Sequence, residues 1–285
     1  IKSRKFLFPS NCPSCGSKTV KEYNLLTKKK DAVRRCSSEG FECEKIAIEK
    51  IKHFVSKDAF NIEGFGKKIV ENFWKLKLIR LPQDIFNLNF NKIEKLDGWG
   101  RQSVLNLKFS IESRKDISFE RFIYALGIRH IGLENAKLIS RNLRKPKNFL
   151  ALSKSNNFSE LINLDGIGET QIHSIKNFFL NQTNLKILND LFKILKIKDG
   201  LEAKNNGLFK NKTFMFTGKL EGISRAEAKS LIEENSGSII SNVTKNLDYL
   251  IIGNKPTKRK VFTAKEMNIK ILSQNEWLKM LNKRS

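Results

Sequence analysis

The chain has 285 residues, of which 40% are hydrophobic, and its formal net charge is +25 at pH 7. This length supports two or three domains, and the hydrophobic content supports buried cores and excludes global disorder. No apolar run is long enough to cross a membrane. The basic charge favours a polyanionic partner. No signal peptide is visible. Because the first residue is Ile1 and not Met, we expect the chain to be a piece of a longer protein.

The first predicted element is a finger built on four cysteines. Cys12 and Cys15 form a knuckle that can present two thiolates to one ion, and Cys36 and Cys43 follow a basic, hairpin-like stretch. Four thiolates predict a closed, tetrahedral, structural zinc site in a reducing compartment. Four unrelated free thiols are the alternative, and a catalytic zinc is disfavoured. We interpret His53 as a packed or solvated side chain and not as a further ligand.

A repeated pattern of glycine turns occupies the middle of the chain. Each turn is followed, four and seven residues after its last glycine, by side chains that fit one buried helix face. The turn needs glycine because its backbone angles exclude a Cβ and because glycine lets another backbone approach closely. The amides that open the following helix form an anion site. The four turns are Ile62–Gly66, Leu96–Gly100, Ile128–Gly132 and Leu164–Gly168.

These turns are typical of the helix-hairpin-helix motif, which grips the DNA backbone without reading its sequence. Four anion sites at a spacing of about 34 residues suit a repeating polyanion better than a small ligand. A helical bundle with glycine turns and no ligand is the alternative, which four motifs in register on a basic chain disfavour. We expect helices at 46–54, Lys57–Phe60, Ile85–Ile93 and Phe119–Leu126 before or between the turns.

One stretch matches a catalytic signature. Lys95-Leu-Asp-Gly98 has the Lys-x-Asp-Gly pattern in which nucleotidyltransferases use the lysine to take up AMP, but it stands in register with the fourth turn. We therefore interpret it as a turn of the repeat. Asp97 and Asp165 could form a paired-carboxylate nuclease site, although aspartate is common in turns for local reasons. We predict no bond chemistry in this segment.

The tail from residue 210 changes to a small α/β pattern. Ser224–Glu227 and Ser273–Glu276 are capping boxes that open helices, and Gly237 is expected to end the first of these helices. Alternating strands and helices predict a parallel sheet. The predicted strands are Thr213–Thr217, Ser238–Ile240, Tyr249–Ile252 and Ile269–Leu272.

The order of these parts resembles the C-terminal half of bacterial NAD-dependent DNA ligases over essentially the whole chain. The stretches that carry the resemblance are Phe8–Gly16, His53–Ser56, Phe122–Arg129, Phe216–Gly218 and Trp277. The resemblance implies a multidomain, mainly α chain with a parallel-sheeted α/β domain at its end. Its implied parts are the last strand of an OB-fold at 1–8, a four-cysteine zinc finger at 9–45, four helix-hairpin-helix repeats at 46–198, a linker at 199–209 and a BRCT-like domain at 210–285.

The resemblance implies that this segment clamps nicked double-stranded DNA for an enzyme that seals nicks in replication and repair. The full enzyme would use NAD+ and Mg²⁺ through domains before residue 1, so the segment alone is expected to be inactive. We expect a cytoplasmic, nucleoid-associated monomer with no membrane partner. A free-standing DNA-binding or scaffold protein and a nuclease-associated repair subunit are the alternatives.

The resemblance also assigns residues. Cys12, Cys15, Cys36 and Cys43 match the zinc ligands, although the loop between the last two is one residue longer than we expect. His130 replaces the first glycine of the third turn. The phosphate-gripping residues would be Gly64, Gly66, Lys67, Lys68, Gly98, Gly100, Arg101, Arg129, Gly132, Gly166 and Gly168, with Thr217 and Gly218 as a further candidate phosphate site.

Overall fold

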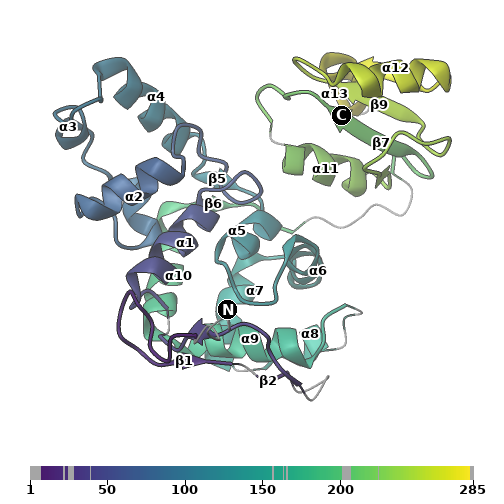
Figure 1. The fold of residues 1–285 in the computed structure, drawn as a ribbon. Coiled ribbons are helices and arrows are strands. Elements are labelled where there is room, and N and C mark those ends of the chain that lie inside the picture. Colours follow the sequence, from purple (N-terminus) through teal and green to yellow (C-terminus); the bar gives the residue numbers. More distant parts are fainter. Residues whose placement is uncertain are drawn as a thin grey trace, which may run out of the picture. The chain divides into compact units, whose positions relative to one another are not determined.

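The computed structural model describes residues 8–21, 23–24, 29–38, 40–155, 157–162, 164, 166–200, 207–223 and 225–282. The chain forms two compact units, Ile1–Ala136 with Lys147–Lys198, and Lys137–Pro146 with Asp199–Ser285 (Figure 1). Most of the predicted OB-fold strand at 1–8 lies outside the described residues, as do Asp165, Ser224 and residues 201–206 of the predicted linker.

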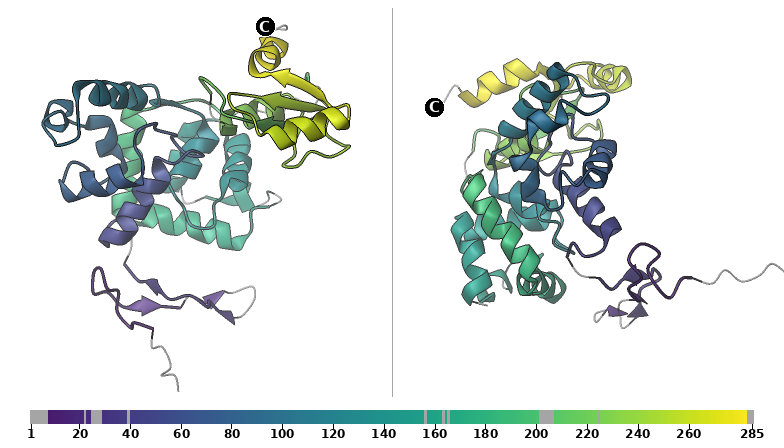
Figure 2. Two further views of the ribbon diagram at one scale, coloured as in Figure 1. Left: turned by 45° about the horizontal axis from the view of Figure 1, so that its top comes forward. Right: turned by 90° about the vertical axis from the view of Figure 1, so that its left-hand side faces the viewer.

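The first unit begins with a finger of short antiparallel strand pairs. Strand β1 (Thr19–Val20) pairs with β4 (Arg35–Cys36), and β2 (Tyr23–Asn24) pairs with β3 (Lys29–Lys30). Helix α1 (Glu44–Phe54) follows directly and begins two residues before the predicted helix at 46–54. Figure 2 shows the finger strands in purple, with α1 continuing from them. The buried face of α1 consists of Ala47, Ile48, Ile51 and Phe54.

The remainder of the first unit is helical apart from one short strand pair. Strands β5 (Asp116–Ile117) and β6 (Lys196–Ile197) pair in parallel, which the sequence analysis did not predict. The helices, of which α6 runs across the boundary between the two units, are α2 (Lys67–Lys75), η1 (a 3-10 helix, Pro82–Asn87), α3 (Phe90–Ile93), α4 (Arg101–Glu112), α5 (Phe119–Ala125), α6 (Leu133–Leu143), α7 (Pro146–Ser155), α8 (Ser159–Ile162), α9 (Glu169–Leu180) and α10 (Gln182–Ile194).

Two of the expected helices are wrong. Residues 57–60 form turns, because the chain doubles back after α1 and buries Phe60 against Phe54, with ring centroids 4.2 Å apart. The expected helix Ile85–Ile93 is broken at Leu88, whose backbone is extended. The Asn89 side chain then accepts a hydrogen bond from the Lys92 amide and caps the short helix α3, as asparagine does at N-caps.

The second unit contains a four-stranded parallel sheet, as predicted. Its strands β7 (Thr213–Thr217), β8 (Ser238–Ile239), β9 (Tyr249–Ile252) and β10 (Lys270–Ser273) lie in the order β10-β9-β7-β8. Alternate side chains of β7 enter two separate apolar clusters, one containing Phe214, Phe216 and Trp277 and the other containing Met215, Leu250 and Ala264. The helices are α11 (Arg225–Glu234), α12 (Lys258–Glu266) and α13 (Gln274–Asn282).

Three local features of this unit sharpen the sequence analysis. Ser236, not Gly237, adopts the left-handed conformation that ends α11, while a Cβ on Gly237 would meet Ile232 Cγ2 at 2.6 Å. Helix α12 was not predicted, because Ala264 is its one buried residue and its apolar side chains do not form a periodic pattern. Phe209, within the predicted linker, is 1% exposed and packs in the first apolar cluster.

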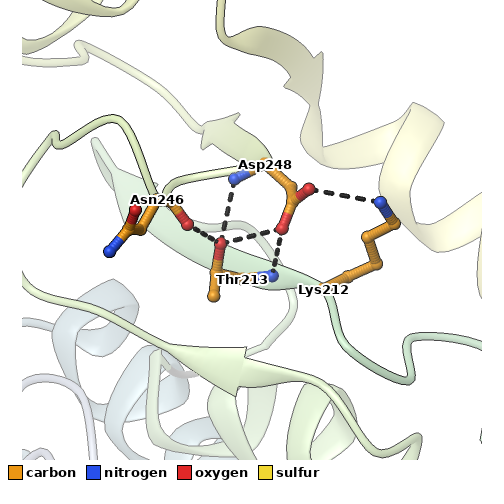
Figure 3. A network of polar contacts seen from close by, with 4 residues as sticks. All are labelled: Lys212, Thr213, Asn246 and Asp248. Carbon is orange, nitrogen blue, oxygen red and sulfur yellow. Dashed lines mark hydrogen bonds and ion pairs between the residues drawn. The ribbon is translucent and has the colours of Figure 1, made fainter.

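A polar network fixes the beginning of β7 to the turn that precedes β9 (Figure 3). The Thr213 amide donates to Asp248 Oδ2 over 2.8 Å, and Lys212 Nζ donates to Asp248 Oδ1 over 3.2 Å. The Thr213 hydroxyl lies 2.9 Å from Asp248 Oδ2 and also contacts the Asn246 carbonyl. Burial opposes ionisation of Asp248, but the hydrogen bonds from Thr213 and Lys212 outweigh it and lower the pKa of that carboxyl.

Candidate functional site

The four cysteines of the finger converge on one point. Their sulfur atoms all lie within 4.8 Å of one another, with Cys15 Sγ 3.4 Å from Cys36 Sγ and Cys12 Sγ 3.9 Å from Cys43 Sγ. Four sulfurs held tetrahedrally by zinc at about 2.3 Å would be separated by about 3.8 Å, which these distances bracket. The residues therefore fit a four-thiolate metal site. Zinc as the ion that fills it stays a prediction.

Local backbone geometry positions these sulfurs. Gly16 has φ +76°, so the chain turns back after the first knuckle and the Gly16 amide donates to the Cys12 carbonyl over 2.9 Å. Cys36 ends β4, and Cys43, 1% exposed, is the N-cap residue of α1. A thiolate at a helix N-terminus is stabilised by the helix dipole.

Hydroxyl groups surround the exposed side of the cysteine cluster. Hydrogen bonds from Ser17 and Ser38 lower the pKa of Cys15 to about 5. Ser38 Oγ lies 3.4 Å from Cys15 Sγ, and the Ser38 amide donates to Cys36 Sγ over 3.4 Å. Donors of this kind stabilise thiolates and fix the orientation of metal ligands.

His53 lies away from the cysteines, in agreement with its interpretation as a packed residue. Its Nε2 atom is 2.8 Å from the Tyr124 carbonyl oxygen, and its ring contacts the Tyr124 ring edge-on at 4.7 Å. A Cβ on Gly127 would lie 3.4 Å from the imidazole. His53 therefore joins α1 to the end of α5.

The four glycine turns share one backbone geometry. In each, the amide of the fourth residue donates to the carbonyl of the first over 3.0 to 3.3 Å. The third residue has a positive φ, between +60° and +89°, as in a type II turn. The fifth residue then precedes the first residue of a helix, and the four hydrogen-bonded pairs are Ile62 with Phe65, Leu96 with Trp99, Ile128 with Ile131, and Leu164 with Ile167.

The apolar side chains of the turns are buried or half-buried, and the glycines are exposed. Phe65 is 1% exposed and stacks edge-on against Phe73 of α2, and Trp99 packs against the same Phe73 ring at 5.4 Å. The predicted helix-face residues after the turns are buried as well: Val70, Val104, Leu107, Ala136, Ile139, Ile172 and Ile175. Gly64, Gly66, Gly98, Gly100, Gly132, Gly166 and Gly168 are exposed.

The space in front of the exposed glycines is open. A Cβ built on Gly66, Gly100 or Gly132 would meet no atom of the described chain within 4 Å. Gly66 and Gly100 also have negative φ, −74° and −91°, which every residue type adopts. The packing of the protein therefore does not demand glycine at these helix starts, so the absence of a side chain there leaves room for something outside the chain.

Two turns differ in detail from the others. His130 takes φ +60° in the third turn, so a histidine occupies the left-handed position that glycine fills elsewhere. In the fourth turn, Gln171 Oε1 accepts a hydrogen bond from the Gly168 amide over 3.1 Å. The amide at the start of α9 is thus covered by its own helix.

The predicted cations lie on the surface beside the turns. Lys67, Lys68 and Arg101 are exposed in the first turns of α2 and α4. The Arg129 side chain is 41% exposed and lies 3.8 Å from Asp31 of the finger, a contact that the sequence analysis missed because the two residues are far apart in the chain. Lys95 is exposed just before the second turn, as expected of a turn residue.

Thr217 and Gly218 are enclosed by their own domain. Thr217 is 2% exposed, and its hydroxyl accepts a hydrogen bond from the Thr257 amide over 3.2 Å. A Cβ on Gly218 would lie 2.7 Å from the Asn254 carbonyl oxygen. These contacts give both residues a local structural role, and phosphate binding here stays a prediction.

Comparisons with known proteins identify two families within the chain. The family described as "BRCA1 C Terminus (BRCT) domain" matches residues 204–281, and the family described as "Helix-hairpin-helix motif" matches residues 121–188. The second match includes the third and fourth turns, so the presence of four repeats stays a prediction. Among the described residues, no helix is long and apolar enough to span a membrane.

Whole-chain relatives are bacterial proteins named DNA ligase. The relative from Pelagibacter ubique (strain HTCC1062) is 73% identical over 281 residues, which cover 99% of this chain and 42% of that protein. The relative from Ehrlichia canis (strain Jake) is 41% identical, with 98% and 41% covered. The relative from Rickettsia typhi is also 41% identical, with 96% and 40% covered. The chain is thus homologous, over almost its whole length, to about two-fifths of these proteins.

Proposed function

We propose, from this homology to bacterial DNA ligases, that the chain is the DNA-gripping part of a NAD-dependent DNA ligase that seals nicks in duplex DNA. The NAD+ and Mg²⁺ chemistry belongs, in this proposal, to the rest of such a protein. The chain presented here binds the duplex as a monomer and holds the nick in place. The homology with proteins named DNA ligase and the helix-hairpin-helix match support this assignment.

The observation that carries the proposal is the open space at the glycine turns. Where a Cβ on Gly66 or Gly100 would meet nothing, a phosphate oxygen can approach the amides of the helix start. The positive end of the helix dipole favours an anion at that position. Lys67 and Arg101 follow these glycines and add charge. Contacts of this kind position a protein on DNA without specifying a sequence.

Larger side chains at the turn glycines test whether the turns bind backbone phosphates. Val fits the negative φ of Gly100 and of Gly168, −91° and −95°, so Gly100→Val and Gly168→Val keep the fold. We expect Gly100→Val to weaken binding of a 20-base-pair nicked duplex about tenfold, because the side chain keeps a phosphate from the amides. Gly168→Val should weaken binding less, because Gln171 already accepts a hydrogen bond from the Gly168 amide. Leu105→Val, at an exposed position of α4, is the control. Binding that both glycine variants leave unchanged would reject the grip.

We also propose zinc as the ion of the four-cysteine site. The sulfur separations fit tetrahedral coordination, and a set of four thiolates is typical of structural zinc. In this role the ion fixes the finger, whose short strands contribute few buried apolar side chains. Metal binding and folding are coupled in such modules. Cys12→Ser should therefore lose the metal and melt the finger locally, measured by metal analysis and amide exchange; the absence of stoichiometric zinc in the unmutated chain would refute this assignment.

A further inference from the structure

Asp31 of the finger joins two arginines that come from different parts of the first unit. Arg35 Nη1 lies 2.5 Å from Asp31 Oδ2, and Arg129 Nη2 lies 3.8 Å from the same oxygen. The two guanidinium groups therefore converge on one anionic atom. The three side chains remain 35 to 43% exposed, so a ligand in solution can reach them.

Further cations lie close in sequence to Asp31, and the two arginines act on His130. Burial, and then the charges of Arg129 and Arg35, lower the pKa of His130, while Asp31 opposes this shift without cancelling it. Lys29 and Lys30, both exposed, form strand β3 just before Asp31. The Asp31 carboxylate thus holds the two arginines together, and the group of charged side chains keeps a net positive charge.

The third turn is the one in which glycine is replaced. His130 occupies the position taken by Gly64, Gly98 and Gly166 in the other turns. A side chain at that position hinders close approach of a phosphate to the backbone. The long arginine side chains reach past this obstruction, and their planar donor groups suit phosphate oxygens.

We propose that Arg35 and Arg129, held side by side by Asp31, form a side-chain site for one phosphate of the DNA backbone. Arg35 and Asp31 then belong to the DNA-binding surface. The finger therefore contacts DNA directly in addition to its structural role. Asp31 acts as a positioning residue. This inference rests on the proposed function, because its ligand is the phosphate of the same duplex.

Charge-neutralising variants test the site in the metal-loaded 285-residue chain with a 20-base-pair nicked duplex. Arg35→Gln and Arg129→Gln should each weaken binding about tenfold and reduce the salt slope by about one. Their double variant should be hardly weaker than either single one, because both arginines serve one phosphate. Lys154→Gln, which removes an exposed charge from α7, is the matched control.

The variant Asp31→Asn distinguishes a role of Asp31 in positioning the two arginines from simple repulsion between its carboxylate and DNA. Removal of a negative charge from a DNA-binding surface would ordinarily strengthen binding. The proposed role predicts weaker binding, by about threefold to tenfold, because the two arginines lose the group that holds them together. Unchanged metal content and circular dichroism of every variant show that the finger stays folded.

The possible results separate this inference from the proposed function. If the unmutated chain does not bind the duplex, the proposed function fails. If it binds but both arginine variants equal Lys154→Gln, or Asp31→Asn strengthens binding, the phosphate site is overturned while the glycine turns keep their role. The site is supported if each arginine variant binds the duplex more weakly, if the double variant is hardly weaker than either single one, and if Asp31→Asn also binds more weakly.

Discussion

The glycines of the hairpin turns in the first unit and two glycines of the second unit, Gly207 and Gly253, serve opposite purposes. In the first unit, a Cβ on Gly64, Gly66 or Gly100 meets no described atom within 4 Å. In the second unit, a Cβ on Gly253 would lie 2.2 Å from the Lys219 carbonyl oxygen, and one on Gly207 would lie 2.2 Å from the Asn235 carbonyl carbon. At Gly207 and Gly253, glycine permits close packing of the chain on itself. At the turns of the first unit it leaves the surface free for a ligand.

Both units are basic, so charge alone does not separate them. The second unit (residues 137–146 and 199–285) carries 20 Lys and Arg against 9 Asp and Glu, and the first unit carries 34 against 20. The difference lies in where backbone amides become accessible. Open space at a glycine that precedes a helix therefore supports a binding role better than a basic composition does.

The largest effect is expected for Gly253→Ala. The new methyl group would overlap the Lys219 carbonyl, and backbone atoms must move to make room. We expect the second unit to lose about 3 kcal/mol of unfolding free energy. The dependence of amide exchange on denaturant at Phe214 and Phe216, residues of that unit's core, measures the loss. A change below about 1 kcal/mol would show that the packing difference between the units is overstated.

Gly98→Ala should have a smaller effect with a different cause. Its Cβ has open space, but φ is +80°, a conformation that costs an L-residue about 1 to 2 kcal/mol. We expect a loss of this size for the first unit in thermal unfolding. The same substitution at Gly64, with φ +78°, should reproduce it. A loss as large as that of Gly253→Ala would mean that the turn is packed and not open.

The pH dependence of the second unit should reveal Asp248. Its pKa is lowered in the folded protein, so its contribution is present above the ordinary carboxyl value of about 3.9 and is lost as the pH falls through the lower folded-state pKa. Because the side chain is 32% exposed, we expect only about 1 kcal/mol. Asp248→Asn should flatten the unfolding free energy below about pH 4, and an unchanged acid limb would contradict the role of the Thr213 network.

The smallest change in stability is expected for Gly66→Ala. Its φ is −74° and its Cβ would meet no atom, so only the modest N-cap preference for glycine over alanine is lost, below about 1 kcal/mol. DNA binding should nevertheless weaken, since the methyl group stands where a phosphate would approach. Thermal unfolding and duplex titration of the same preparation check both statements. A stable variant with unweakened binding would remove the first turn from the grip.

The sequence predicted features that depend on short-range patterns. Cysteine spacing indicated a cluster that the structure brings together, and the glycine pattern indicated turns whose backbone geometry is the same in all four segments. The Ser273–Glu276 capping box also forms, with the Ser273 amide 2.7 Å from Glu276 Oε2. The turns and the capping box are decided by residues within a few positions of one another, and the cysteine cluster is indicated by a spacing typical of metal-binding fingers.

Features that depend on distant residues escaped prediction. The parallel pairing of β5 with β6 joins residues 116 and 196, and neither strand is long enough to show a periodic pattern. The contact between Asp31 and Arg129 likewise exists only because the fold brings the finger and the third turn together.

The salt dependence of duplex binding tests the central claim most directly. If the turns and their cations grip backbone phosphates, the logarithm of the association constant should fall linearly with the logarithm of salt concentration, with a slope of about −0.9 for each phosphate neutralised. The affinity should be equal for duplexes of unrelated sequence. A flat salt response, or affinity confined to one sequence, would contradict the account.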